Sequence, residues 1–414
     1  MTGAFGAEVF RTWMLNIGEA IPDGNGGYTV SLKETELETV RTFVAKLKAN
    51  GVKQIVALQG PLIPNDFPKF VGASGKTYSH AQVESGENGS DELIRADKYA
   101  FPEPGTPEYD AFMSVQVEYY RLLSKALPDI THFEGINEPE KGGPVHKIGW
   151  LSSDEQALLN NQSSYNLSNY EYTISEIAQI TMDYNHAITE GVRKANKGAK
   201  VLSSGLMTIA LTKTYLTEAY KYITSENNYY KDTNPDNYFE ILNWHPYVFI
   251  GTNSDSSLPY STVAQWDKQY WADTWVKFQK DLYQIAVNYG DGDTPVWFTE
   301  FGVSDCTGTD NTSEQGITEA MTSTRLRDML DLVEEELDFV DTVIAFRMFD
   351  LENDADTAYE CNFGMVEYFD YISSSQEALK EIGKTFYQIV NNSSDYTNIN
   401  DVLDKYYKGL TQGQ

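Results

Sequence analysis

Residues 295–301, Pro-Val-Trp-Phe-Thr-Glu-Phe, form a short and nearly unbroken apolar stretch that carries one carboxylate near its end. A strand covered on both faces needs such continuous apolar character, which is typical of parallel sheets. Six further stretches of this kind occur along the chain. The seven predicted strands are 8–13, 53–59, 130–135, 200–204, 239–245, 295–301 and 342–349.

Amphipathic helical patterns occupy the intervals between these strands. In residues 34–49 the apolar side chains recur on one stripe, and Asn50-Gly51 then ends the helix. The other predicted helices span 109–126, 172–196, 213–224, 272–289, 314–336 and 376–391. Since strand and helix alternate throughout, we predict a single domain, residues 1–414, with the α/β fold of a (β/α)8 TIM barrel.

The composition excludes several classes of partner. Asp and Glu total 61 against 31 Lys and Arg, and the resulting net charge of −30 repels phosphate backbones and anionic membranes. We therefore expect neither nucleic acid nor a membrane as a partner. We expect no membrane span and no signal peptide within these residues, and a signal removed from the native chain stays open, so secreted and cytoplasmic locations are both possible. Localisation and oligomeric state stay undetermined.

Metal ions and cofactors are also not expected. The five histidines show no HxH or HExxH pairing, and the chain has neither a GxSxG elbow nor a phosphate-binding glycine loop. Two cysteines, Cys306 and Cys361, are too few for a cysteine-based cluster. They lie in loops after the last two predicted strands. The sequence does not decide whether they form a disulfide or stay two independent thiols.

The segment Gly135-Ile136-Asn137-Glu138-Pro139 comes at the end of the strand at 130–135. A carboxyl buried beside a strand end is favoured in its protonated form, which suits the donor of a proton to a glycosidic oxygen. The preceding asparagine can hydrogen-bond a substrate hydroxyl. Taken alone, the segment equally fits a turn that starts a helix.

Glu300 stands at the end of the strand at 295–301, where a carboxylate among apolar residues needs a partner or a task. Taken alone, it also fits a salt bridge at the barrel rim. Glu138 and Glu300 are more informative as a pair, because both end parallel strands and face the same rim. Two carboxylates across a cleft are the minimal equipment for glycoside cleavage.

With these motifs the chain resembles the retaining (β/α)8 glycoside hydrolases called clan A. The resemblance rests on Ile-Asn-Glu-Pro at 136–139 and Thr-Glu-Phe-Gly at 299–302. It implies hydrolysis of β-glycosidic bonds in an oligo- or polysaccharide, with Glu138 as acid/base, Glu300 as nucleophile and Asn137 on the sugar 2-hydroxyl. A barrel that binds carbohydrate without catalysis is the alternative.

The resemblance also predicts that one strand of the barrel is missing from this chain. It places Glu138 after the fourth strand and Glu300 after the seventh, so residues 8–13 become the second strand. Too few residues precede them to form a first one. We expect the first strand to be absent from this chain, with a shortened or permuted barrel as the alternative.

Further site residues follow from the same resemblance. Arg11 is expected to keep the nucleophile ionised, although a structural arginine also fits. Tyr247 is expected to hydrogen-bond Glu300, and His245 to orient a substrate hydroxyl or the carboxylates.

The sugar platform is harder to assign, because the clan's usual tryptophan after strand eight is replaced here by Ala-Phe-Arg-Met-Phe-Asp at 345–350. The candidates for this platform are Phe346, Phe349, Trp13 and Trp244. Asp350 is a candidate for binding hydroxyls. Neither the sugar, the linkage nor endo or exo action can be predicted.

Overall fold

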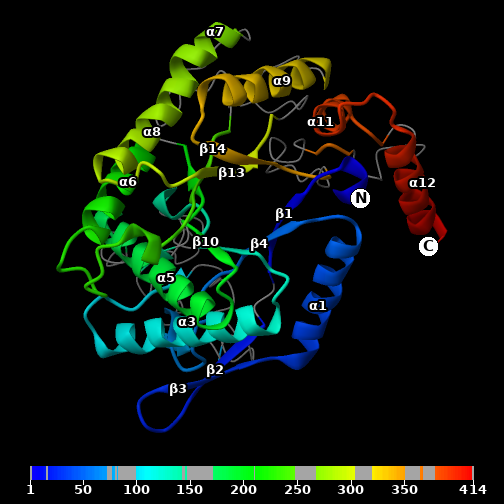
Figure 1. Cartoon of the computed structure of the whole chain (residues 1–414). Helices are drawn as coiled ribbons and strands as arrows, with labels where there is room; N and C mark the ends of the chain where they lie inside the picture. Colours follow the sequence, from blue (N-terminus) through cyan, green and yellow to red (C-terminus); the bar gives the residue numbers. More distant parts are fainter. Residues whose placement is uncertain are drawn as a thin grey trace, which may run out of the picture.

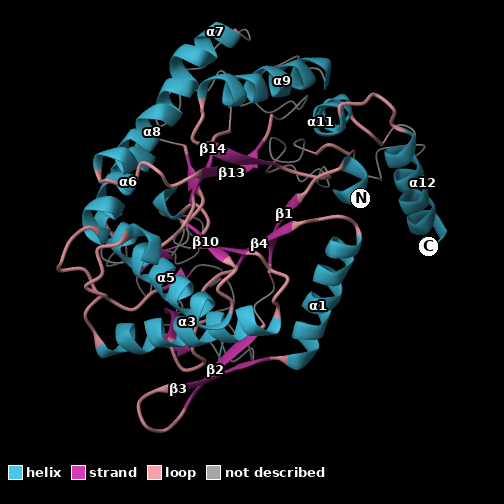
Figure 2. Ribbon diagram, viewed as in Figure 1, coloured by secondary structure: helices cyan, strands magenta, loops and turns pink. Residues whose placement is uncertain are grey.

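The structure is a computed structural model. It describes residues 2–14, 17–71, 77–79, 82, 99–141, 145–146, 171–208, 210–247, 267–303, 319–349, 364–366 and 378–412. Within these ranges parallel strands stand at the centre and helices surround them (Figure 1, Figure 2). The arrangement is the α/β barrel that the alternation of strands and helices predicts.

Two four-stranded parallel sheets make up the barrel wall. The first contains β1 (Val9–Trp13), β4 (Gln54–Leu58), β8 (His132–Glu134) and β10 (Lys200–Leu202) in that order. The second contains β11 (Leu206–Met207), β12 (Leu242–His245), β13 (Val296–Phe301) and β14 (Val340–Ala345). All seven predicted strands are present, with ends displaced by a few residues.

The two sheets join where the chain passes from β10 to β11. Leu202 bridges Ile241 just before β12, and β11 then pairs with β12, so β10 and β11 are two parts of one barrel strand. Gly205 lies between them. A Cβ atom there would lie 2.5 Å from His245 Nε2 and 2.7 Å from Glu134 Oε1, so only glycine lets the backbone pass.

The helices cover the outside of the strands. They are α1 (Glu34–Ala49), α3 (Pro107–Ala126), α5 (Ile174–Ala195), α6 (Ala210–Ile223), α7 (Lys268–Trp271), the π-helical η6 (Ala272–Val276), α8 (Lys277–Asn288), α9 (Glu319–Glu336), α11 (Glu381–Asn391) and α12 (Thr397–Gln412). Local sequence explains their starts: α5 begins with a capping box in which Thr173 and Glu176 bond each other's backbone. The predicted helices are confirmed; α12 was not predicted.

The remaining helices and strands are short and lie outside the two parallel sheets. The hairpin of β2 (Gly18–Pro22) and β3 (Tyr28–Leu32) was not predicted, although its glycine-rich turn is a hairpin signal. The others are η1 (Thr2–Phe5), β5 (Pro68–Val71), β6 (Thr77–Ser79), β7 (Tyr99–Ala100), η3 (Pro139–Lys141), β9 (Val145–His146) and η5 (Pro235–Asn237). No helix in the described part of the chain is long and apolar enough to cross a lipid bilayer.

Two layers of apolar side chains hold the barrel together. The larger lies between the strands and the surrounding helices, and it includes Val40 and Val44 of α1. The smaller fills the barrel interior with Val56, Leu202, Ile241 and Trp297. Together they fix the strand ends, and those ends carry the site.

No strand pairing joins β1 to β14 in the described residues, although the two strands lie next to each other. In the described residues β1 pairs only with β4, and β14 pairs only with β13. Ahead of β1, residues Thr2–Phe5 form the 3-10 helix η1 and pack against α11 and α12, so they do not supply an eighth strand. That a first strand is missing stays a prediction.

Candidate active site

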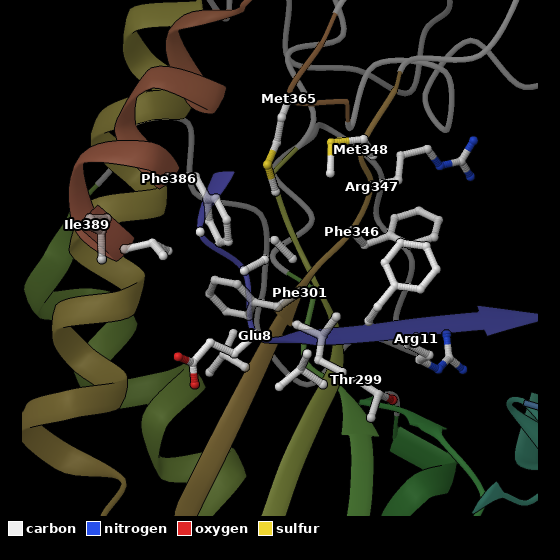
Figure 3. Close-up of a pocket in the computed structure, with 18 of the residues that line it drawn as sticks. Glu8, Arg11, Thr299, Phe301, Phe346, Arg347, Met348, Met365, Phe386 and Ile389 are labelled. Carbon is white, nitrogen blue, oxygen red and sulfur yellow. The ribbon is translucent and has the colours of Figure 1, made fainter. Parts of the chain in front are cut away.

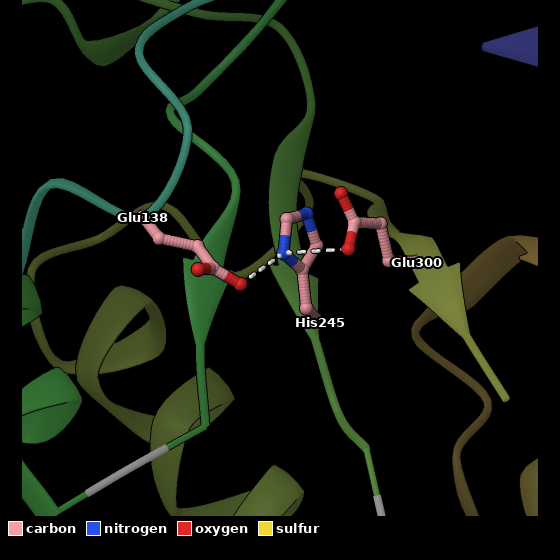
Figure 4. Close-up of side chains that lie close together, drawn as sticks. All are labelled: Glu138, His245 and Glu300. Carbon is pink, nitrogen blue, oxygen red and sulfur yellow. Dashed lines mark hydrogen bonds and ion pairs between the residues drawn. The ribbon is translucent and has the colours of Figure 1, made fainter. Parts of the chain in front are cut away.

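Glu138, His245 and Glu300 meet at the carboxyl-terminal ends of the strands (Figure 4). One oxygen of each carboxylate and one nitrogen of the imidazole all lie within 4.8 Å of one another. The Glu138 and Glu300 side chains are 15 % and 10 % exposed, whereas His245 is fully buried. The two glutamates that are far apart in the sequence thus share one small, partly open site.

Glu138 is held in an unusual backbone conformation. Its φ of 46° lies in the left-handed region, which costs a residue with a Cβ atom on the order of 1–2 kcal/mol. Its N–H donates to the carbonyl of Gly205 at 2.7 Å, which ties the segment after β8 to the bend between β10 and β11. Holding this carboxyl towards His245 therefore lowers the stability of the fold.

An irregularity in β13 directs Glu300 into the site. The register between β13 and β14 shifts between Phe298 and Phe301, where Glu300 lies. Strict alternation would place Thr299 and Glu300 on opposite faces of the sheet, yet Thr299 contacts His245 and Glu300 lies beside it. A bulge of this kind re-aims one side chain, and such irregularities are common next to active sites.

A chain of hydrogen bonds sets the orientation of His245. Asn243 Nδ2 donates to Glu134 Oε1 at 2.7 Å, so its Oδ1 accepts from the Thr299 hydroxyl at 2.5 Å. The Thr299 oxygen in turn accepts from His245 Nε2 at 3.1 Å. This assignment places a proton on Nε2 and turns Nδ1 towards the two catalytic candidates.

His245 Nδ1 lies 3.1 Å from Glu138 Oε1 and 3.7 Å from Glu300 Oε2. At 3.1 Å one proton must lie between the imidazole and Glu138, either on the carboxyl or on Nδ1. A transferable proton therefore lies between His245 and Glu138. Glu300 is the more distant partner of the same nitrogen.

Glu300 is surrounded by groups that favour its ionised form. Arg11 Nη1 donates to its Oε1 at 2.5 Å, and the Tyr247 hydroxyl donates to its Oε2 at 2.7 Å. Burial opposes ionisation, but the charges of His245 and Arg11 and the bond from Tyr247 outweigh it and lower the pKa of Glu300. Burial and the Glu300 charge raise the pKa of Tyr247, so its hydroxyl keeps its proton.

Arg11 also binds a carboxylate that sequence reasoning missed. Its Nε donates to Glu134 Oε2 at 2.5 Å, and its Nη2 donates to Glu134 Oε1 and Asn137 Oδ1, each at 2.8 Å. Burial would lower the pKa of Arg11, but Glu134 and Glu300 together raise it. The sequence held a signal, because Glu134 is a charge inside an apolar strand.

Glu134→Gln should lower the free energy of unfolding by about 3 kcal/mol, because it removes one partner of a buried ion pair. Glu134 is fully buried and the Arg11 side chain is 7 % exposed. Urea unfolding measures the change. The matched control is Glu118→Gln, which breaks a half-exposed surface pair with Arg121 and should cost less than about 1 kcal/mol. Equal effects of the two substitutions would contradict the assignment.

The aromatic candidates separate into two groups. Trp13 ends β1 with 61 % of its surface exposed, and Phe346 packs edge-on against Tyr247, with ring centroids 5.8 Å apart. Trp244, by contrast, is fully buried and packs against Phe298, so it has no free face for a sugar. Phe349 packs with the cluster around α11 and α12 instead of the site.

Three predicted residues lie outside the part of the chain that the structure describes. They are Asp350, Cys306 and Cys361. Part of the long segment at 60–108 and most of those at 139–170, 302–314 and 350–375 also lie there.

The same three side chains also have the spacing of a metal site, since each offers one ligand atom. The charge balance argues against a cation at this position. Glu300 is already paired with the guanidinium of Arg11 at 2.5 Å, which repels a second positive charge. The arrangement suits an ionised Glu300 facing a Glu138 carboxyl group that shares a proton with His245.

No family model matches the sequence, and no curated protein is detectably similar to it. Solved structures are similar in fold. The GH1 β-glucosidase from Exiguobacterium antarcticum B7 superposes with a TM-score of 0.52 at 11% identity, covering 94% of this chain and 84% of that chain. The chain has the fold of the GH1 β-glucosidases.

Two further structures agree with this fold. The β-glucosidase from Exiguobacterium marinum gives a TM-score of 0.52 at 13% identity, covering 94% of this chain and 84% of that one. Virulence factor SghA from Agrobacterium tumefaciens gives 0.51 at 13% identity, covering 95% and 84%. The predicted resemblance to TIM-barrel glycoside hydrolases is therefore confirmed for the fold.

Proposed function

We propose that this protein hydrolyses β-glycosidic bonds with retention of configuration, with Glu300 as nucleophile and Glu138 as acid/base. The observation that carries the proposal is the unequal environment of the two carboxylates. Glu300 is held ionised by Arg11 and Tyr247, whereas Glu138 shares one proton with His245. An ionised carboxylate beside a carboxyl group that shares a proton is what a nucleophile and an acid require.

The spacing supports retention. Carboxylate oxygens of Glu138 and Glu300 lie within 4.8 Å of each other. Retaining enzymes hold the two carboxyl groups about 5–5.5 Å apart, whereas inverting enzymes need about 6.5–9.5 Å to admit a water molecule. The observed spacing leaves no room for that water between the two groups.

The proposed reaction proceeds in two displacements. Glu300 attacks the anomeric carbon while Glu138 protonates the departing oxygen, which leaves a glycosyl ester on Glu300. Glu138, now a carboxylate, then takes a proton from water as the water attacks the same carbon, which breaks the ester bond and releases Glu300 as a carboxylate. His245 holds Glu138 in place in both steps, and Asn137, oriented by Arg11, donates its amide to the sugar.

A carbohydrate substrate is supported by the fold and by the exposed ring of Trp13 at the rim. The fold neighbour SghA has been described in complex with salicin, named as its substrate analogue, at a TM-score of 0.50 and 11% identity. Aryl β-glycosides are therefore the first substrates to test.

The decisive experiment is a panel of aryl β-glycosides and β-linked oligosaccharides, with proton NMR of the first anomer released. We expect turnover with initial formation of the β-anomer, unchanged by EDTA. Release of the α-anomer would overturn retention, and loss of activity in EDTA would favour a metal at Glu138, His245 and Glu300. Saturable binding of oligosaccharides without any turnover would favour the non-catalytic barrel.

Tyr247→Phe should move the acidic limb of the pH profile of kcat/KM to higher pH. The hydroxyl stabilises the Glu300 carboxylate, so its loss raises the pKa of Glu300, and ionisation is then lost at a higher pH as the solution is acidified. Loss of a hydrogen bond to a charged group should also lower kcat about ten- to hundredfold. The control is Tyr28→Phe, which removes an exposed hydrogen bond from the Tyr28 hydroxyl to the carboxylate of Asp66. An unmoved acidic limb would contradict this role.

Trp13→Ala should raise KM about tenfold with little change in kcat, because stacking binds substrate and transition state alike. Steady-state kinetics on an oligosaccharide measures both constants. Phe43→Ala on α1 is the control, since Phe43 is a large apolar side chain exposed to 39%. A fall in kcat at constant KM would assign Trp13 to the chemistry instead.

A further inference from the structure

Arg347 lies just after the carboxyl end of β14, at the same barrel rim as the candidate active site. Its side chain is half-buried, and its guanidinium carbon lies 4.4 Å from the centre of the Phe346 ring. Phe346 in turn packs edge-on against Tyr247, whose hydroxyl donates to Glu300. A positive charge is thus separated from the tyrosine that holds the candidate nucleophile by a single aromatic ring.

Arg347 has no carboxylate partner among the residues that the structure describes, and this sets it apart from other arginines of the chain. Those that pair with a glutamate are Arg11, Arg41, Arg121 and Arg193. Pairing is the expected state in a chain with 61 acidic and 31 basic side chains. The guanidinium of Arg347 therefore keeps its N–H donors for another acceptor.

The contact between Arg347 and Phe346 also changes what the ring can bind. A sugar stacks its C–H groups on a bare aromatic face, and Phe346 is a candidate for such a platform. Here the guanidinium lies over the ring, within the range of a cation–π contact. The contact holds the charge in one place, so less freedom is lost when an anion binds. The platform position presents a fixed cation instead of a bare ring.

One cavity connects this cation with the exposed ring of Trp13. Trp13, Phe346, Arg347 and Arg11 all line a space of about 480 Å³ (Figure 3). In Figure 3 the two arginines and Phe346 lie on one side of this space, and Glu8 lies on the other. Arg11 is already bonded to two glutamates. Arg347 is consequently the arginine that can meet an anion there.

We propose that the sugar bound at this site carries a carboxylate, as a β-linked uronic acid does, and that Arg347 selects it. The inference rests on the proposed glycosidase function and narrows its substrate class. The planar fork of a guanidinium matches the two oxygens of a carboxylate. One guanidinium also balances one negative charge, so a doubly charged phosphate ester fits less well.

The rest of the protein favours the opposite choice. The net charge of −30 and the carboxylates of Glu138 and Glu300 repel an anionic sugar. A preference for uronic acids therefore needs a local cation. Removal of Arg347 should reverse the preference as well as weaken it.

The test compares 4-nitrophenyl β-D-glucuronide with the β-D-glucoside, and the β-D-galacturonide with the β-D-galactoside. In at least one pair we expect the acid to have a kcat/KM about tenfold higher or more. Arg347→Gln should lower the value for that acid about ten- to hundredfold and change the neutral value less than about threefold. Arg347→Lys keeps the charge but loses the fork, so it should recover only part of the preference.

Equal or higher rates on the neutral sugar of both pairs would overturn the proposal, as would an unchanged preference in Arg347→Gln. Arg41→Gln on α1 is the control, because it removes one positive charge at an exposed position and should leave the ratio unchanged. Thermal melts check that the variants fold. Tighter binding of the glucoside 6-phosphate than of the glucuronide would exclude a carboxylate as the selected group.

A binding measurement separates this inference from the proposed function. Isothermal titration with methyl β-D-glucuronide and methyl β-D-galacturonide needs no turnover. Binding that depends on Arg347, without hydrolysis of any glycoside, would retain the selection of a carboxylate and overturn the glycosidase. Hydrolysis of neutral glycosides in preference to acidic ones would do the reverse. Neither binding nor hydrolysis would overturn both.

Discussion

Glu300→Gln should lower kcat/KM on every substrate by about 10⁴-fold or more, because the amide cannot attack the anomeric carbon. Glutamine is nearly isosteric and still accepts the hydrogen bond from Tyr247, so fold and sugar binding should persist. Circular dichroism and binding of an oligosaccharide check these two points. The control is Glu118→Gln, at a surface position on α3, which should retain full activity.

The proposed role of Glu300 also predicts how the defect of Glu300→Gln depends on the leaving group. The chemical defect must be large for good and poor leaving groups alike, since every substrate needs the bond from Glu300 to the anomeric carbon in the first displacement. A substrate for which Glu300→Gln retains more than about a tenth of the wild-type rate would contradict a nucleophilic role.

Glu138→Gln should show the opposite pattern. For alkyl glycosides and oligosaccharides, whose leaving oxygen needs a proton, we expect the first step to slow by about 10²–10⁴-fold. For dinitrophenyl glycosides, which need no proton, the first step should be nearly unchanged. Pre-steady-state kinetics on a leaving-group series gives this comparison as the slope of log kcat/KM against leaving-group pKa.

A steep slope in the variant and a shallow one in the wild type would identify the acid. Equal losses across the series would assign Glu138 to structure. Gln keeps the size of the side chain and can accept from His245 Nδ1 when that nitrogen is protonated, so the site should keep its shape in the variant.

Sequence alone was sufficient for the residues that end strands. Glu138, Glu300, Arg11 and Tyr247 belong to strands or to the residues that follow them, and the carboxyl ends of parallel strands meet at one rim. The structure brings these four together through hydrogen bonds or a shared partner. Their catalytic roles remain proposals.

What sequence did not supply was the direction of side chains within strands. Asn243 and His245 both face the barrel interior, so the residue between them, Trp244, must face the helices. A continuously apolar strand carries no alternation from which this could be read. For Glu300 the alternation rule itself fails, because of the irregularity between Phe298 and Phe301.

The long-range network was also beyond prediction. Glu134 and Arg11 are 123 residues apart, and their contact depends on how neighbouring strands are staggered. The stagger is set by packing over the whole barrel, so no local sequence pattern encodes the contact between Glu134 and Arg11.

The left-handed backbone at Glu138 has a consequence for stability. Glycine or asparagine is relaxed at such a φ, so replacing the glutamate with either should raise the free energy of unfolding. Under the proposed function the same replacement removes the acid/base carboxyl group, so stability and turnover should change in opposite directions at this one position.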